Sequence, residues 1–434
     1  MSKRRVSRRT RSRRDLGSSP GTGRGGAVSG LVGQAASGDG IDERGLFGPD
    51  FDPADVIEAP ADQPLPQIVP KPDPAPHPQP SHQPARIVRT SDLTPPANVP
   101  KPLAPPKRTP DPEPDVTTEA GPCPACDNAY SRELFESTDV LYATTTRRFQ
   151  VVECVQCRLI RLSPWPTPSE LRHYYPETYW FAAGNGTAAR LEESYRRFVL
   201  ADHVRFVRRA VENGGEAGPV LDVGCGGGLF LRMLAERGIP VVGLDFSLDA
   251  ASVAWHGNRV PAMCATLTRA PIQPGSCAAI TMFHVLEHLY DPGAYLDAAH
   301  ELLKPNGRLV IQVPNAACWQ FLLFGDRWNG IDVPRHLINF KESDIVGLLE
   351  ACGFEIVHRK HFSWRDNPAG LATTLAPSLD PMARRVRRIK DSPGLKLFKD
   401  IVYLGLVFAS IPFTIIEATC YAGSTIMIEA RKKA

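Results

Sequence analysis

The sequence predicts an α/β fold, in which a sheet carries helices on both faces, preceded by a small cysteine-rich module and a disordered leader. Three observations support this prediction. Short apolar strands alternate with helical segments from Pro219 onward and end in glycine-rich or acidic turns. Two Cys-x-x-Cys pairs lie ahead of that region. Finally, 20 of the 42 prolines fall between residues 51 and 115, a density that a packed domain does not tolerate, because each proline removes a backbone donor.

Charge separates the leader from the rest of the chain. Of 434 residues, 42% are hydrophobic, enough for one large or two modest domains. The first 14 residues carry a charge of +8 and the whole chain +3, so the other 420 residues carry −5. A body of that sign lacks the broad positive surface typical of nucleic-acid-binding domains. We expect residues 1–115 to be a disordered leader, first basic and then Pro-rich, whose basic head either binds a polyanion or stays solvated.

The cysteines indicate a metal site in a reducing compartment. The predicted ligands are four thiols with the spacing of a closed tetrahedral Zn²⁺ site, Cys123, Cys126, Cys154 and Cys157. A strand-like run at 148–153 leads into the second pair, as in a zinc ribbon; four free structural cysteines are the alternative. The other six cysteines are scattered singly, and no apolar stretch follows the Arg-rich start. We therefore expect a cytoplasmic protein without disulfides or a signal peptide.

A connector and a helix follow the cysteine-rich module. Aromatic residues cluster in a Pro-punctuated stretch after the second cysteine pair: Tyr174, Tyr175, Tyr179 and Trp180. We expect them to seal the module, residues 116–185, onto the next domain. From about Ala188, apolar residues recur at helical spacing.

The next elements carry a nucleotide-binding pattern. An apolar strand at 220–223 ends in the glycine loop 224–228, and a helix is expected from Leu229 to Arg237. A second strand, 240–245, ends in Asp245. Glycines allow a sharp turn and close approach of the backbone to a ligand, and an acid after the next strand suits two ribose hydroxyls. Together they predict an adenosine-containing cofactor.

The loop reads D-x-G-x-G-x-G, and on these residues the chain resembles class I S-adenosylmethionine-dependent methyltransferases. The resemblance implies a Rossmann-like seven-stranded sheet with S-adenosylmethionine as cofactor. The resemblance to this superfamily continues through residues 265–267, 276–288 and 304–315 and includes a final strand at 424–430. The chain departs from the superfamily at Ser276-Cys277-Ala278, where an acidic residue is often found. The resemblance implies cofactor contacts from Asp222, Gly224, Cys225, Gly226, Gly228, Asp245, Phe246, Leu267 and His284.

Within this superfamily, the residues at 324–328 and 333–337 resemble those of a bacterial subgroup that also carries an N-terminal zinc ribbon. That subgroup is associated with cell-surface polysaccharide, lipid-linked glycan and natural-product pathways. We expect the methyltransferase domain to comprise 186–373 with 424–434, and 374–423 to be a basic and hydrophobic helical insertion.

The predicted catalytic residues are Glu287, His288 and His336. His284, Glu287 and His288 form H-x-x-E-H just after the fourth strand, and three interpretations remain open. His288 is a general base suited to neutral pH, or the trio binds a divalent metal, or the residues cap the strand and line the cofactor. In ubiquinone-pathway and small-RNA methyltransferases an E-x-x-E-H at this place holds Mg²⁺; His284 disfavours Mg²⁺, which prefers oxygen. His336 is a second candidate base or an ordinary packed residue.

The insertion combines basic and apolar segments. Seven basic residues precede Ile401–Ile416, which holds 16 uncharged residues: Arg384, Arg385, Arg387, Arg388, Lys390, Lys396 and Lys399. The apolar run is shorter than the roughly 20 residues of a membrane span. Residues 384–416 therefore lie on an anionic membrane surface, form a buried or dimerising helix, or span the membrane.

The sequence as a whole predicts methyl transfer to a hydroxyl or carbon of a small-molecule acceptor, sugar-containing or lipid-linked. The enzyme would be cytoplasmic, or peripheral on the inner membrane surface. Two alternatives remain: an RNA methyltransferase that uses the ribbon and basic tail, and a non-catalytic, membrane-tethered binding module.

Overall fold

The structure, a computed structural model, describes residues 121–175 and 187–433. The predicted leader, residues 1–115, and the aromatic residues Tyr179 and Trp180 lie outside the described residues. Side chains at 187–189 and 191 are likewise not described.

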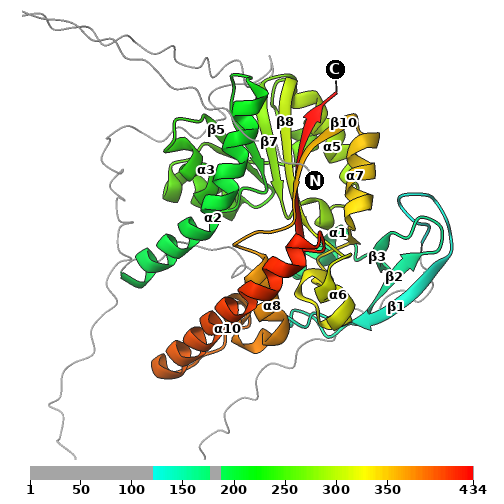
Figure 1. The fold of residues 1–434 in the computed structure, drawn as a ribbon, viewed down its shortest axis with the longest axis vertical. Helices are drawn as coiled ribbons and strands as arrows, with labels where there is room; N and C mark the ends of the chain where they lie inside the picture. Colours follow the sequence, from blue (N-terminus) through cyan, green and yellow to red (C-terminus); the bar gives the residue numbers. More distant parts are fainter. Residues whose placement is uncertain (1–120, 176–186, 434) are drawn as a thin grey trace, which may run out of the picture. The chain divides into compact units, whose positions relative to one another are not determined.

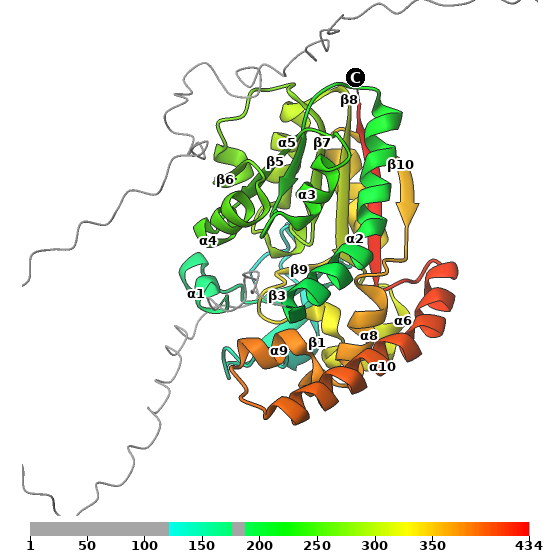
Figure 2. The same cartoon turned by 90° about the vertical axis from the view of Figure 1, so that its left-hand side faces the viewer.

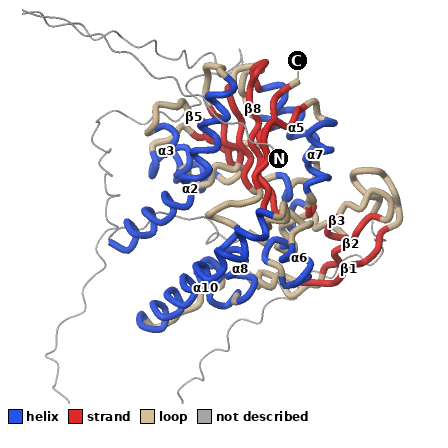
Figure 3. The backbone as a smooth tube through the Cα atoms, in the orientation of Figure 1, coloured by secondary structure: helices blue, strands red, loops and turns tan. Residues whose placement is uncertain are grey.

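A seven-stranded sheet forms the centre of the fold, which confirms the predicted class (Figures 1 and 3). Its order is β10-β11-β8-β7-β4-β5-β6. The strands from β8 to β6 pair in parallel, whereas β11 is antiparallel to both of its neighbours. The bounds are β4 Val220–Val223, β5 Val241–Asp245, β6 Ala262–Cys264, β7 Cys277–Phe283, β8 Leu303–Pro314, β10 Phe354–Lys360 and β11 Thr425–Lys432. The strand order reverses between β4 and β7, and ligands of open α/β sheets bind at the carboxyl ends of strands at such a point.

Helices cover both faces of this sheet because its strands alternate their apolar side chains between two cores. Helices α2 (Thr187–Gly214) and α3 (Leu229–Ala235) pack on one face, in a core with Ala279 of β7 and Val310 of β8. Helices α5 (Pro292–Leu302) and α7 (Glu342–Ala351) pack on the other face, against Ile280. The strands and helices expected between 188 and 245 are therefore present, with boundaries shifted by one or two residues.

A second, four-stranded sheet holds the cysteine-rich module. It consists of β1 (Ser131–Ser137), β2 (Phe149–Cys154), β3 (Ile160–Ser163) and β9 (Ile338–Asn339), all antiparallel. Helix α1 (Pro168–His173) follows, and Thr167 and Glu170 form a capping box at its start. Because β9 comes from beyond β8, the ribbon sheet crosses the domain boundary expected at residue 185.

The remaining helices lie near the carboxyl-end side of the large sheet (Figure 2). They are α4 (Leu248–Ser252), α6 (Trp319–Phe324), α8 (Asn367–Leu375), α9 (Pro381–Val386) and α10 (Pro393–Thr419), with short turns at Val253–Gly257, Leu267–Arg269, Leu286–His288, Gly325–Arg327, Asn329–Ile331 and Pro377–Leu379. The apolar run predicted at 401–416 falls inside α10, whose 27 residues include Pro412. Among the described residues, α10 is the one helix long and apolar enough to cross a membrane.

Candidate functional site

The glycine loop follows β4 at the carboxyl edge of the sheet. Gly224, Gly226 and Gly228 all have φ between 53° and 76°, a region that L side chains rarely adopt. A Cβ on Gly224 would lie 2.9 Å from Val285, and one on Gly228 would lie 2.9 Å from Ala254, so both positions require glycine for packing. A Cβ on Gly226 would meet nothing within 4 Å. The middle glycine thus leaves open space where a ligand can approach the backbone.

Asp245 lies beside this loop at the end of β5. Its carboxylate is 2% exposed and accepts hydrogen bonds from the backbone N–H of Gly226 and of Ser247, each at 2.9 Å. Burial raises the pKa of Asp245. Each carboxylate oxygen keeps a further acceptor site, as two ribose hydroxyls require.

Phe246 and Leu267, also predicted to contact the cofactor, differ in exposure. Phe246 is 60% exposed, and its ring meets that of Tyr175 edge-on, with centroids 6.2 Å apart. Leu267 is buried. The glycine loop, the carboxylate of Asp245 and the exposed ring of Phe246 together fit the adenosyl part of S-adenosylmethionine.

Asp222 and Cys225 turn their side chains into the core, which differs from the predicted cofactor contacts. Asp222 accepts a 2.5 Å hydrogen bond from the Thr281 hydroxyl, and burial raises its pKa to about 7. The Cys225 thiol packs against Gly243, where a Cβ would lie 2.7 Å from the sulfur. The side chains of Asp222 and Cys225 therefore support the glycine loop from the core side, and only the backbone of these two residues lies next to the loop.

His284 has a role that the sequence did not reveal. Its Nδ1 lies 3.1 Å from Glu287 Oε1, and its Nε2 lies 3.5 Å from Asp366 Oδ1. Burial opposes a charge on this ring, but the hydrogen bonds with Asp366 and Glu287 outweigh it and raise the pKa of His284 to about 9. The Nε2 of His284 also lies 2.9 Å from the side-chain amide nitrogen of Gln312. The described residues that gather three possible metal-ligand atoms near His284 are Glu287, His288 and His336, and this group does not include His284 itself.

A different trio gathers next to it. One ligand atom each from Glu287, His288 and His336 lies within 4.8 Å of the other two. Glu287 and His288 come from the turn after β7, whereas His336 comes from the segment that leads into β9. The rings of His288 and His336 meet edge-on, with centroids 4.7 Å apart. The structure thus brings together all three predicted catalytic residues.

Backbone carbonyls fix the tautomers of both histidines. The Nδ1 of His288 lies 2.9 Å from the carbonyl oxygen of Arg335, and the Nδ1 of His336 lies 2.8 Å from that of Gly330. Because a carbonyl only accepts, each Nδ1 carries the proton in the neutral ring, and each Nε2 keeps its lone pair. The Tyr175 hydroxyl oxygen, 3.0 Å from the Nδ1 of His288, is then a second acceptor of that proton. Burial and then the neighbouring His288 lower the pKa of His336 to about 4, so this ring stays neutral.

Glu287 completes the trio as a buried anion. Burial favours its neutral form, but the hydrogen bond and charge of His284 hold the pKa of Glu287 below its ordinary value. Its Oε1 pairs with His284, and its Oε2 has no hydrogen-bond partner among the described residues. A buried carboxylate oxygen without a donor is costly and requires a proton, a water or a metal ion nearby.

Arg335 connects this trio to the ribbon; the motif at 333–337 contains it, but the sequence assigned it no role. Its guanidinium is fully buried and pairs with Asp139 of the ribbon at 2.8 and 3.0 Å and with Asp332 at 2.7 Å. It also donates to the carbonyl oxygen of Tyr174 at 3.1 Å. Since the carbonyl of Arg335 orients His288, the ion pairs that hold Arg335 position the trio as well.

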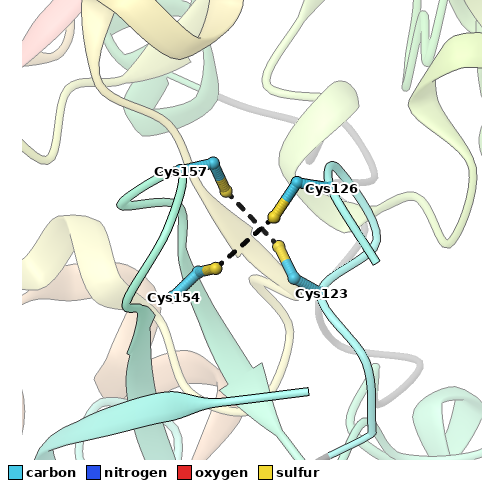
Figure 4. A group of neighbouring side chains, drawn as sticks. All are labelled: Cys123, Cys126, Cys154 and Cys157. Atoms are coloured by element: carbon cyan, nitrogen blue, oxygen red, sulfur yellow. Dashed lines mark hydrogen bonds between the residues drawn. The ribbon is translucent and has the colours of Figure 1, made fainter. Parts of the chain in front are cut away.

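The four predicted metal ligands converge in the ribbon (Figure 4). The Sγ atoms of Cys123 and Cys157 are 3.5 Å apart, and those of Cys126 and Cys154 are 3.6 Å apart. Tetrahedral Zn²⁺ with Zn–S bonds of about 2.3 Å places its sulfurs about 3.8 Å apart. Burial opposes ionisation of Cys154, but the backbone N–H groups of Cys157 and Gln156 lower the pKa of its thiol to about 6. The cluster fits a structural zinc ion.

Comparisons with known proteins agree with this geometry. Residues 193–359 match a family described as "Methyltransferase domain". The chain is 35% identical over 154 residues, 31% of its length, to a ubiquinone biosynthesis O-methyltransferase of Idiomarina loihiensis, and 39% identical over 113 residues, 24% of its length, to one of Xylella fastidiosa. The matches span 61% and 45% of those two proteins.

Among solved structures, this chain is similar to an S-adenosylmethionine-dependent methyltransferase from Archaeoglobus fulgidus. The superposition covers 54% of this chain and 94% of that protein, with 18% sequence identity and a TM-score of 0.36. The family match, the seven-stranded sheet and the glycine loop beside Asp245 identify residues 193–359 as a class I S-adenosylmethionine-dependent methyltransferase domain.

Proposed function

We propose that this chain is an enzyme that transfers the methyl group of S-adenosylmethionine to a small-molecule acceptor. One observation carries the proposal. The glycine loop after β4 and Asp245 at the end of β5 lie at the same edge of the sheet as Glu287 and His288, which follow the adjacent strand β7, and His336 joins these two from the segment before β9. A cofactor held by the first pair would thus have a basic group beside it, at the switch point of the sheet.

His288 is the base in this proposal. S-adenosylmethionine supplies an electrophilic methyl group, and an acceptor hydroxyl attacks it in line once the acceptor is positioned and deprotonated. The Nε2 of His288 carries the lone pair that takes this proton, since its Nδ1–H is held by the Arg335 carbonyl. Glu287 would stabilise the imidazolium that forms, because its carboxylate is buried beside the ring.

The acceptor is proposed from coarser support. The relatives are named as O-methyltransferases, which favours a hydroxyl oxygen over carbon. We propose a sugar-containing or lipid-linked molecule, as in cell-envelope glycan or natural-product pathways. Residues 384–416 would then bring the cytoplasmic enzyme to the inner membrane surface where a lipid-linked acceptor resides.

The proposed division of labour follows the expected domains. Residues 186–373 with 424–434 would carry the reaction, and the zinc-loaded ribbon within 116–185 would act as a structural module. Four protein ligands leave no open position for substrate at such a zinc ion. Residues 374–423 would contact the membrane.

A divalent metal at Glu287, His288 and His336 is a second candidate. The lone pairs on both Nε2 atoms and the unpartnered Glu287 Oε2 favour it, because a metal-bound histidine commonly donates its other N–H to a carbonyl. Two imidazoles and one carboxylate suit Zn²⁺ or another transition metal better than Mg²⁺. Elemental analysis separates the two candidates: a second metal equivalent that disappears in His336→Ala supports the metal, and its absence from wild type supports a metal-free base.

The proposed function is tested with purified full chain, S-adenosylmethionine labelled in its methyl group, and fractionated bacterial extracts. We expect label in a small-molecule or lipid fraction, and His288→Ala should slow transfer by about 10²- to 10⁴-fold while still binding the cofactor. His256→Ala, an exposed histidine, is the matched control.

Other outcomes would point elsewhere. Label in RNA, with binding that weakens steeply in salt, would replace the proposal by the RNA methyltransferase. Cofactor binding without transfer to any fraction would favour a non-catalytic binding module.

A further inference from the structure

Helix α10 is inverted in polarity compared with a surface helix of a soluble protein. Its buried positions are Val407, Ser410, Thr414 and Glu417, three of them polar, and the partly buried Tyr403 lies at the same helical spacing. Its exposed positions recur at helical spacing and are almost entirely apolar: Leu397, Phe398, Ile401, Leu404, Phe408, Pro412, Ile415 and Ile416. Water normally selects the opposite arrangement.

The polar face of α10 is held by specific contacts. The carboxylate of Glu417 accepts hydrogen bonds from the backbone N–H of Gln320 at 3.0 Å and from its side-chain amide at 2.8 Å. Tyr403 forms a 2.9 Å hydrogen bond with the hydroxyl of Thr373 in α8. The helix is therefore fixed in this orientation along its length, and its apolar face cannot rotate inward without breaking buried polar contacts.

Exposed apolar side chains lie on α10 and also on α6, which contacts α10 through the hydrogen bonds between Gln320 and Glu417. Phe398, Ile401 and Phe408 are each 60–64% exposed. Helix α6, which provides Gln320, also leaves Leu322 and Leu323 exposed at 76% and 65%. Surfaces of this kind mark a contact with another apolar phase or protein.

The charged residues next to α10 indicate what contacts its apolar face. The segment 384–400, which leads into α10, contains seven Arg and Lys residues and two Asp residues. Arg384 is buried in ion pairs with Asp391 and Asp400, so the predicted basic cluster is smaller on the surface than the sequence suggests. Arg388 and Lys390 are exposed, and neither forms an ion pair among the described residues. Cations at one end of an apolar helical face suit anionic lipid headgroups next to acyl chains.

We propose that the apolar face of α10 lies in the surface of an anionic lipid bilayer, with Arg388 and Lys390 at the headgroups. The helix lies on the bilayer and does not span it. Its start follows α9 and its end leads into β11, the strand between β8 and β10, so both ends are attached to the same folded body. This inference does not depend on the proposed catalytic activity.

Vesicle co-sedimentation with the full chain tests the proposal, using phosphatidylcholine vesicles with and without phosphatidylglycerol. We expect binding to the anionic vesicles. Phe408→Glu should weaken it by about tenfold or more, because one large apolar side chain is lost from the membrane and a charge is added. The pair Arg388→Gln and Lys390→Gln should weaken it by about thirtyfold, from roughly 1 kcal/mol per cation. Neither change should lower the melting temperature, since these side chains are exposed.

Val357→Glu is the matched control, since Val357 is an exposed apolar residue on β10 and should leave binding unchanged. Three outcomes would overturn the proposal. Failure of wild type to bind any vesicle excludes it. Unchanged binding by Phe408→Glu would assign lipid contact to the basic head of the chain. Loss of a dimer in that variant, without vesicle binding by wild type, would assign the face to a second copy of the chain.

Discussion

Replacing Asp139 with asparagine removes one of two carboxylates that neutralise Arg335, and we expect it to destabilise the fold and displace His288. Arg335 is fully buried, and its guanidinium also lies over the ring of Tyr142, 4.6 Å from the centroid. Asp139 is 3% exposed and itself accepts from the backbone N–H of Tyr142. Neither charge can therefore recover its hydration when the other is lost.

The magnitude follows from burial. Removing one partner of a buried ion pair costs about 3–5 kcal/mol, because an uncompensated charge remains. Asp332 still pairs with Arg335, so we expect about 3 kcal/mol for Asp139→Asn, at the lower end of that range. Arg335→Met leaves the buried carboxylate of Asp139 and the partly buried one of Asp332 without their shared cation and should cost about 5 kcal/mol.

Urea unfolding measures these differences in the free energy of unfolding, provided that its dependence on urea concentration has the same slope in wild type and variant. The matched control is Glu136→Gln, which breaks the exposed pair with Arg148 on the same ribbon and should change the free energy of unfolding by about 1 kcal/mol or less. Burial opposes ionisation of Asp139, but Arg335 lowers its pKa below the unfolded value of about 3.9. The stabilisation is thus present above about pH 4 and lost as pH falls through the lowered pKa, so wild type and variant should converge in acid. An equal, small effect of Asp139→Asn and Glu136→Gln would refute this account of the ribbon contact.

Two further predictions concern the zinc cluster and the core of the sheet. Cys126→Ser should lose one equivalent of zinc by elemental analysis, whereas Cys264→Ser, an exposed cysteine outside the cluster, should keep it; retention of zinc in the first variant would exclude the cluster as the site. Asp222→Asn should gain stability relative to wild type as pH rises from about 4 to about 7. Burial raises the pKa of Asp222 in the folded state above its unfolded value, so its ionisation in this pH range destabilises wild type but not the variant. A difference in the free energy of unfolding that does not vary with pH would contradict the buried position.

The parts of the site that the sequence predicted are those encoded by local pattern. The glycine loop follows a strand of four residues and Asp245 ends a strand of five, so the ends of these strands fix where the loop and the carboxylate lie. The Cys-x-x-Cys spacing likewise brings the thiols of each knuckle close to one another. Such features depend on a few neighbouring residues, so periodicity and turn chemistry are enough to recognise them.

The parts that were missed depend on contacts between distant segments. Asp366 raises the pKa of His284, yet it lies 82 positions later in the chain, at the residue before α8, and no spacing rule connects the two. His336 was itself a predicted catalytic residue, but its contact with His288 was not predicted, because it depends on β9, a two-residue strand without a sequence signal that completes the ribbon sheet. Composition likewise indicates that α10 is apolar, but only packing reveals that its polar side faces inward.

Cofactor binding tests the central claim most directly. Calorimetric titration of the full chain with S-adenosylmethionine should give one site per chain, and Asp245→Ala should abolish it, because the carboxylate that borders the glycine loop is lost. Asp249→Ala, an exposed acid on the neighbouring helix α4, should bind as wild type does. Saturable one-to-one binding that fails only in Asp245→Ala is the predicted result; a folded wild-type chain that binds no S-adenosylmethionine, or an Asp245→Ala variant that binds it unchanged, would contradict the account.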